Sequence, residues 1–394
     1  MSRSAIIGSG RLLPMTGART GQMEAIEGPW VVVIEAGRVV EVRAGRLEPG
    51  DPDAVVDVGG ALLTPGLVDP HTHLVFVGDR ADEAAARSRG EAYTGGGILR
   101  TVQATSEAGD EELLGATRER LRAAIAGGTT TIEVKSGYGL AASQELRQLR
   151  LIRAAAAGLP LRVRRTFLGA HAVPLGATPR DQAAVVIEAL PEAAPESDSI
   201  DVFCEPGIFD LELTRAILDA GRRHGLALRL HADQLERSGA AMLGVEMGAA
   251  SVDHLEQAGS QEVQALAGGS TVACVLPGPA LLLGRGLPPV RALVDAGACL
   301  AIGSDANAGT FGVPSMPLAV GLGVVLGLTV DEALWAATAG AARSLHLVGR
   351  VGVVAAGAAA DLVAWDAAHE GDFALRLGAV TPLHRWFAGA AGEV

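Results

Sequence analysis

The alternation of strands and helices from about residue 66 onward most constrains how this chain can fold. Eight short segments rich in apolar or β-branched residues are separated mostly by amphipathic helical stretches. Several are continuously apolar, as expected for parallel strands covered on both faces. The pattern predicts an α/β protein built on a (β/α)8 TIM barrel. The eight predicted strands cover residues 67–74, 129–134, 161–168, 200–204, 227–231, 251–255, 271–276 and 299–303.

An open, doubly wound parallel sheet would produce the same alternation of elements. No Gly-x-Gly-x-x-Gly motif follows the first predicted strand, which weakens a dinucleotide-binding version of that fold. Both ends of the chain have β character instead. Residues 30–35 and 38–42 predict a hairpin, and residues 361–366 predict a further strand. We expect the two ends, 1–60 and 350–394, to form a small β-sandwich domain beside a barrel of residues 61–349.

Composition narrows the class of protein further. The chain has 394 residues and a formal net charge of −13, which argues against nucleic acid or an anionic membrane as a partner. Its three cysteines lack Cys-x-x-Cys spacing, so they predict neither a disulfide framework nor a structural zinc site. No run of about 18 apolar residues and no signal peptide is evident. These features predict a cytoplasmic protein.

Metal-capable side chains gather at the C-terminal ends of the predicted strands. In a barrel these ends share the face that holds the active site. Residues two apart in a strand point to the same side, so His71 and His73 can reach one point. A single histidine at a strand end is most often structural, but that interpretation would have to explain the whole set. The set comprises His71, His73, His171, His231, His254 and Asp305.

With these residues in place, the chain resembles the amidohydrolase superfamily over nearly its whole length. Narrower motifs resemble its imidazolonepropionase branch, which acts in histidine degradation. That resemblance implies hydrolysis of the ring amide of 4-imidazolone-5-propanoate to N-formimidoyl-L-glutamate, with one zinc or iron ion as cofactor. The motifs that carry it lie at residues 71–80, 133–140, 166–174, 201–205, 231–235 and 305–310.

The resemblance also implies roles for single residues. The metal ligands would be His71, His73, His231 and Asp305. Asp305 would act as general base and then acid, assisted by His254 and by His231. Arg80 matches the family's cation for the propionate, since a planar guanidinium suits a carboxylate. The substrate-binding residues would be Arg80, Tyr93, Tyr138, His171, Gln234, Asn307, Gly309 and Thr310.

Four features of the chain bear on the number of metal ions and on substrate binding. Related dinuclear enzymes carry a carboxylated lysine after the fourth strand, where this chain has Glu205. Its only lysine, Lys135, follows the second strand, so one metal ion is favoured. Some relatives carry glutamate at the position of Gln234, and glutamine cannot exchange protons, so we assign Gln234 to ring binding. The loop at residues 91–98 is shorter than in relatives, which could move Tyr93 away from the substrate.

Two alternatives stay open at this stage. One is another mononuclear cyclic amidohydrolase or deaminase of the same superfamily; Arg80, Tyr138 and residues 307–310 argue for the imidazolone instead. The other is a non-catalytic scaffold, which would have lost metal ligands, and none is missing. The sequence does not distinguish zinc from iron. For partners, the resemblance suggests a small-molecule substrate and a homodimer, with no nucleic acid and no membrane.

Overall fold

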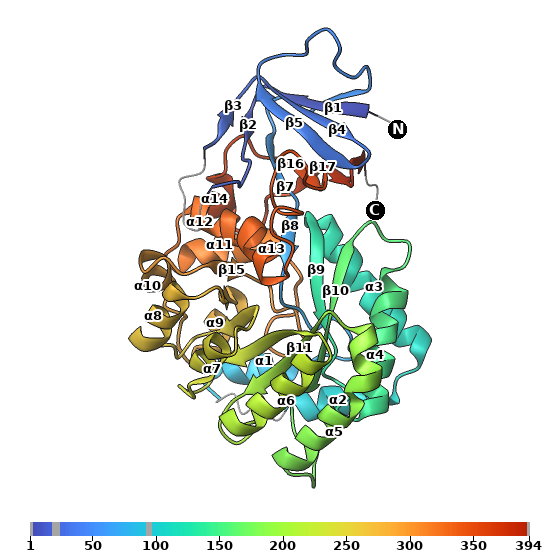
Figure 1. Ribbon diagram of the computed structural model, residues 1–394, viewed down its shortest axis with the longest axis vertical. Coiled ribbons are helices and arrows are strands. Elements are labelled where there is room, and N and C mark those ends of the chain that lie inside the picture. Colours follow the sequence, from blue (N-terminus) through green and yellow to red (C-terminus); the bar gives the residue numbers. More distant parts are fainter. Residues whose placement is uncertain (1–2, 18–23, 92–96, 392–394) are drawn as a thin grey trace.

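Eight parallel strands form the central sheet of the protein. The computed structural model describes residues 3–17, 24–91 and 97–391, and Figure 1 shows the arrangement of its elements. The strand order is β15-β14-β13-β12-β11-β10-β9-β8, so each strand lies beside its neighbours in the chain. All eight predicted strands are confirmed. They are β8 (Leu67–Asp69), β9 (Thr129–Lys135), β10 (Arg162–Ala170), β11 (Ser199–Cys204), β12 (Ala227–Ala232), β13 (Ser251–His254), β14 (Val272–Val275) and β15 (Leu300–Ile302).

The sheet closes into a barrel through the segments that follow β8 and β15. The backbone N–H of Asp305 donates to the carbonyl of His71 at 3.0 Å, and His73 donates to Ala306 at 2.9 Å. The first strand is shorter than predicted, since β8 ends at Asp69 rather than at residue 74. Pro70 has no N–H for the strand ladder, which explains the early end. The contacts that close the barrel therefore also hold three of the predicted metal ligands, His71, His73 and Asp305.

Helices cover the outside of the barrel, and Figure 1 shows α3 to α6 along one flank. Helix α3 has its apolar stripe turned inward, with Leu113, Leu121 and Ile125 buried. Two extra helices, α1 and α2, follow β8, and α9 follows β14. The helices are α1 (Ala81–Ser88), α2 (Gly97–Glu107), α3 (Asp110–Ala126), α4 (Ala142–Ala156), α5 (Pro179–Ala193), α6 (Leu211–Arg223), α7 (Ala240–Glu246), α8 (Ser260–Gly268), α9 (Pro277–Leu283), α10 (Val290–Asp295), α11 (Met316–Val325), α12 (Val330–Trp335), α13 (Ala341–Ser344) and α14 (Asp372–Leu375).

Two further sheets lie at one end of the barrel and combine both chain ends (Figure 1). Trp30 from one sheet and Leu362 from the other belong to a shared buried core. The predicted hairpin is confirmed as β4 and β5. Strand β7 belongs to the second sheet although it lies beyond residue 60, and the division into two domains stays a prediction. The strands of the first sheet are, in order, β5 (Arg38–Ala44), β4 (Trp30–Glu35), β1 (Arg3–Gly8) and β6 (Val55–Asp57). Those of the second sheet are β18 (Ala390–Ala391), β17 (Pro382–Phe387), β16 (Leu362–Trp365), β7 (Leu62–Pro65), β2 (Arg11–Leu12) and β3 (Ile26–Glu27).

None of the helices within the described ranges is long and apolar enough to cross a bilayer.

The barrel strands are almost entirely buried, because helices cover one face and packed side chains fill the other. The fold therefore places the carboxyl ends of all eight strands on the face away from the terminal sheets. That face is where the sequence predicts the functional side chains.

Candidate metal centre and active-site pocket

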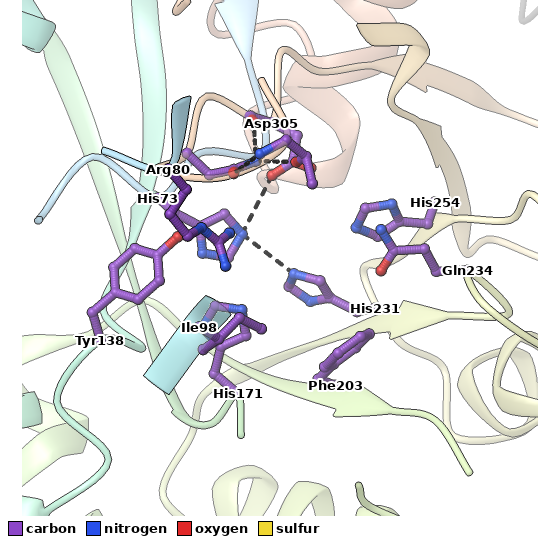
Figure 2. Close-up of a pocket in the computed structure, with 12 residues that line it drawn as sticks. His73, Arg80, Ile98, Tyr138, His171, Phe203, His231, Gln234, His254 and Asp305 are labelled. Carbon is purple, nitrogen blue, oxygen red and sulfur yellow. Dashed lines mark hydrogen bonds and ion pairs between the residues drawn. The ribbon is translucent and has the colours of Figure 1, made fainter. Parts of the chain in front are cut away.

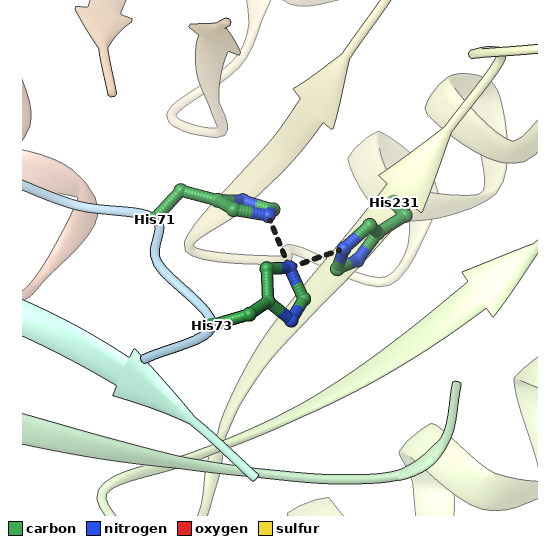
Figure 3. Close-up of side chains that lie close together, drawn as sticks. All are labelled: His71, His73 and His231. Carbon is green, nitrogen blue, oxygen red and sulfur yellow. Dashed lines mark hydrogen bonds between the residues drawn. The ribbon is translucent and has the colours of Figure 1, made fainter. Parts of the chain in front are cut away.

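Three imidazole rings converge where His71 and His73 follow β8 and where His231 lies one residue before the end of β12 (Figure 3). The Nε2 atoms of His71 and His73 are 3.2 Å apart, and those of His73 and His231 are 3.3 Å apart. Two ligands each about 2.0–2.1 Å from a tetrahedral metal ion would lie about 3.3 Å apart. Within the described part of the chain, this is the only group of three or more possible metal ligands. Its spacing fits one ion.

In two of the three imidazoles, those of His71 and His231, a neighbouring carboxylate determines which ring nitrogen carries the proton. The Nδ1 of His71 lies 2.7 Å from Asp253 Oδ2, and the Nδ1 of His231 lies 3.1 Å from Asp201 Oδ1. An ionised carboxylate only accepts hydrogen bonds, so each Nδ1 donates and each Nε2 keeps its lone pair. Burial lowers the pKa of both histidines and of His73. The lone pairs on the Nε2 atoms of His71 and His231 both face the Nε2 of His73, whose Nδ1 has no hydrogen-bond partner among the described residues. A metal ion at this point would bind all three nitrogens.

Asp305 supplies a carboxylate at the same point. Its Oδ1 lies 3.5 Å from the Nε2 of His73 and 3.7 Å from the Nε2 of His71. The residue has a φ of +49°, a conformation that aspartate tolerates better than most side chains. Burial raises the pKa of Asp305 to about 7. The four predicted metal ligands thus lie together, and Asp305 is placed both to bind a metal and to accept a proton.

A pocket of about 40 Å³ lies beside His73 and His231. Figure 2 shows its two ends, with His254 beyond His231 and Tyr138 beside His73. Ile98 and Phe203 also line it, and the sequence analysis missed both because they look like ordinary core residues. Tyr93 lies outside the described residues. The lining residues are His73, Arg80, Ile98, Tyr138, His171, Phe203, His231, Gln234, His254, Asp305, Asn307 and Thr310.

Two histidines of the pocket have opposite electrostatic character. His171 donates from Nδ1 to the carbonyl of Gly137 at 2.9 Å, and burial lowers its pKa to about 3. It is therefore neutral and offers the lone pair of Nε2. Burial also lowers the pKa of His254, but the carboxylates of Glu256 and Asp305 outweigh it, so that this pKa lies above its ordinary value. His171 suits a hydrogen-bond acceptor role, whereas His254 suits a donor role.

Arg80 is a buried cation with few protein partners. Its side chain lines the pocket, and only 3% of the residue is exposed. Its Nε and Nη1 lack hydrogen-bond partners among the described residues, and Glu83 Oε2 lies 3.9 Å from Nη1. Burying a cation without such bonds is costly, which favours an anionic ligand here. A Cβ on Gly309 would lie 1.5 Å from Arg80 Nη2, so only glycine leaves room for this guanidinium.

Asn307 organises the loop that follows β15. Its Oδ1 accepts from the backbone N–H groups of Gly309 and Thr310, each at 2.8 Å. Its Nδ2 donates to the carbonyl of Asp305 and to Thr310 Oγ1, each at 2.7 Å. These four bonds use the whole capacity of a side-chain amide. Asn307 therefore shapes the loop, and its direct contact with a substrate stays a prediction. Gly309 does not line the pocket itself and acts through the space that it leaves for Arg80.

Comparison with known proteins agrees with this site. A family model described as the amidohydrolase family matches residues 62–390. An imidazolonepropionase from Rubrobacter xylanophilus is 46% identical over 367 residues, covering 90% of this chain and 88% of the relative. One from Salinispora arenicola is 44% identical and covers 93% of each chain. The chain belongs to the imidazolonepropionase branch of the amidohydrolase family.

The fold of this amidohydrolase is also that of solved structures with low sequence identity. An adenosine deaminase from Xanthomonas campestris with bound zinc has a TM-score of 0.77 at 19% identity, covering 100% of this chain and 93% of that one. At that identity the likeness supports the architecture alone. The (β/α)8 barrel predicted from the strand–helix alternation is therefore confirmed by both topology and structural comparison.

Buried charged residues lie next to the candidate metal centre of this amidohydrolase, and the sequence does not reveal their positions. Lys135 Nζ lies 2.8 Å from Glu133 Oε1 and 2.8 Å from Asp201 Oδ2. Burial lowers the pKa of Lys135, but these carboxylates outweigh it and raise the pKa above its ordinary value. The available signal was the presence of single charged residues inside otherwise apolar strands, such as Asp201 in β11 and Arg229 in β12.

Glu205, at the end of the fourth barrel strand, has a structural role. Its carboxylate accepts from the backbone N–H groups of Gln234, Leu235 and Glu236 at 2.7, 2.9 and 3.2 Å. It therefore holds the loop after β12, which carries Gln234 into the pocket. A carboxylate engaged in this way is not available to bridge two metal ions.

Proposed function

We propose that this amidohydrolase hydrolyses the ring amide of 4-imidazolone-5-propanoate to N-formimidoyl-L-glutamate. Water adds to the carbonyl carbon, the ring C–N bond breaks, and the nitrogen leaves with a proton. Family membership supports the reaction. The observation that carries the substrate choice is Arg80, a buried guanidinium in the same pocket as the histidine cluster. This guanidinium can bind the carboxylate of the propionate while the ring of the same substrate lies beside the histidines.

We infer that one zinc or iron ion is held by His71, His73, His231 and Asp305. Such an ion would polarise a water molecule and lower its pKa to about 7. A single ion is supported by the engagement of Glu205 with backbone N–H groups. The amine of Lys135 is likewise engaged by Glu133 and Asp201 and is not a free group that could be carboxylated.

The protein's own groups would move the protons. Asp305 would accept a proton from the attacking water and return it to the leaving ring nitrogen, because its Oδ1 lies 3.5 Å and 3.7 Å from the Nε2 atoms of His73 and His71, beside the position where the ion and its water would be held. His254 would donate a hydrogen bond to the oxygen that gains charge. The lone pair on His171 Nε2 would accept from a ring N–H, and Gln234 would bind the other edge of the ring. Thr310 would complete the carboxylate site beside Arg80.

The test is an assay of purified, metal-depleted protein that receives measured amounts of zinc or iron. Activity on 4-imidazolone-5-propanoate should rise until about one equivalent of metal is bound per chain, and the product should be the ring-opened formimidoyl acid. Release of ammonia with the ring intact would instead assign the chain to a deaminase. No turnover with a full equivalent of either metal would overturn the proposal.

The remaining expectations concern the cellular location, the oligomeric state and the partners of the enzyme. We propose a cytoplasmic homodimer without nucleic-acid or membrane partners, which the acidic net charge and the family resemblance support. Light scattering on the purified protein tests the oligomeric state. A monomer that is fully active would refute the dimer without affecting the proposed reaction.

A further inference from the structure

Five charged side chains form a buried layer inside the barrel, next to the metal centre. They come from strands β9, β11, β12 and β13, and none is more than 1% exposed. Two cations and three anions give the layer a net charge of −1. A barrel interior filled with apolar side chains would avoid the desolvation of five charges. The layer consists of Glu133, Lys135, Asp201, Arg229 and Asp253.

Asp201 and Asp253 each contact the imidazole of a predicted metal ligand, and each is also paired with a buried cation. Asp201 accepts through Oδ1 from the Nδ1 and the backbone N–H of His231, at 3.1 and 3.2 Å, while its Oδ2 pairs with Lys135. Asp253 accepts from His71 through Oδ2, the oxygen that also lies 3.2 Å from Arg229 Nη2. Arg229 in turn donates to two backbone carbonyls, which fix its position.

We propose that Lys135, the only lysine in the chain, is a positioning residue for metal binding that acts through Asp201. By holding Oδ2, Lys135 keeps Oδ1 directed at the Nδ1–H of His231. The ring then presents the lone pair of Nε2 to the metal. Behind His71, Arg229 contacts the same Asp253 oxygen that accepts from the imidazole, and Lys135 Nζ lies 3.9 Å from that oxygen. This inference rests on the proposed function, because it requires a metal ion at the three imidazoles.

The contacts of Glu133 provide a matched control. Its Oε1 accepts a hydrogen bond from Lys135, which also forms the ion pair with Asp201. Its Oε2 accepts from the backbone N–H of Thr72 at 3.2 Å and not from an imidazole. Glu133→Gln therefore removes a buried carboxylate from the same lysine without touching the ring of a metal ligand. If Asp201 orients a metal ligand and Glu133 does not, variants of these two carboxylates should differ in their effect on metal affinity.

The experiment measures zinc affinity by competition with a chromophoric chelator, in the full-length wild type and four variants. Asp201→Asn should bind zinc about 10–100-fold more weakly, since an amide can donate to Nδ1 and place the proton on Nε2. Lys135→Met should weaken binding by about tenfold. The double variant should bind no more weakly than Asp201→Asn alone, because both changes act along one path. Glu133→Gln should stay within about threefold of wild type.

The free energy of unfolding of the metal-free proteins, from denaturant titration, separates positioning from a purely structural role. A structural role would lower that free energy in Lys135→Met and leave zinc affinity unchanged, which overturns the proposal. Tighter zinc binding, the result of merely removing a positive charge near a cation, also overturns it, as do losses that multiply in the double variant.

Three further outcomes keep the test decisive. If Lys135→Met does not fold, Asp201→Asn tests the same path, and an unchanged zinc affinity in that variant refutes the inference. A wild-type protein that binds no zinc or iron would refute the proposed function itself. A wild type that binds metal and hydrolyses the imidazolone, with variants of equal affinity, would refute only the positioning role.

Discussion

Replacing Arg80 with methionine tests the substrate anchor. The variant keeps most of the apolar stem and removes a guanidinium that is 3% exposed and has two nitrogens without hydrogen-bond partners in the described residues. Hydrogen bonds to charged groups contribute about 1.5–3 kcal/mol, and the upper end suits a buried two-pronged contact. A loss of about 3 kcal/mol corresponds to a rise in KM of about 150-fold. The kcat should change little, because the carboxylate is remote from the bond that breaks.

Steady-state kinetics on two substrates isolates the contact. Wild type should prefer 4-imidazolone-5-propanoate over the analogue that carries a propanamide, and Arg80→Met should lose that preference. Arg291→Met is the control, since Arg291 is an exposed arginine on α10 paired with Asp295 at 2.8 Å. It removes the same charge from the protein without touching the pocket. An unchanged KM in Arg80→Met, or an equal loss on both substrates, would place the carboxylate elsewhere.

Three further predictions concern the same site. Gly309→Ala should raise KM toward the value of Arg80→Met in steady-state kinetics, because its Cβ would lie 1.5 Å from the guanidinium, and a wild-type KM would contradict the packing argument. Asp305→Asn should lower kcat by about 10²–10⁴-fold with an unchanged circular dichroism spectrum, and wild-type turnover would refute proton transfer by this carboxylate. Removal of metal should lower the melting temperature, since an ion at about 1,000 times its Kd stabilises the folded state by about 4 kcal/mol; a thermal melt with and without zinc checks this.

Much of the site was predictable because of one topological rule. The carboxyl ends of parallel strands meet on one face of a barrel, so residues placed after separate strands converge even when they lie far apart in the chain. His71, His73, His231 and Asp305 could therefore be grouped from their positions alone. The early end of β8 was also readable in principle, because Pro70 cannot donate to a strand ladder.

Contacts across strands depend on distances that a linear sequence does not contain. The sequence alone is equally compatible with a surface arginine at Arg80, and burial beside Gly309 gives it a functional meaning. The amide of Asn307 looks available for a ligand until its four bonds within the loop are seen. Lys135 is conspicuous as the only lysine, yet its partners become visible only when β9 and β11 are placed in one barrel. Residue type determines which bonds a side chain can make, and packing determines which of them are already used.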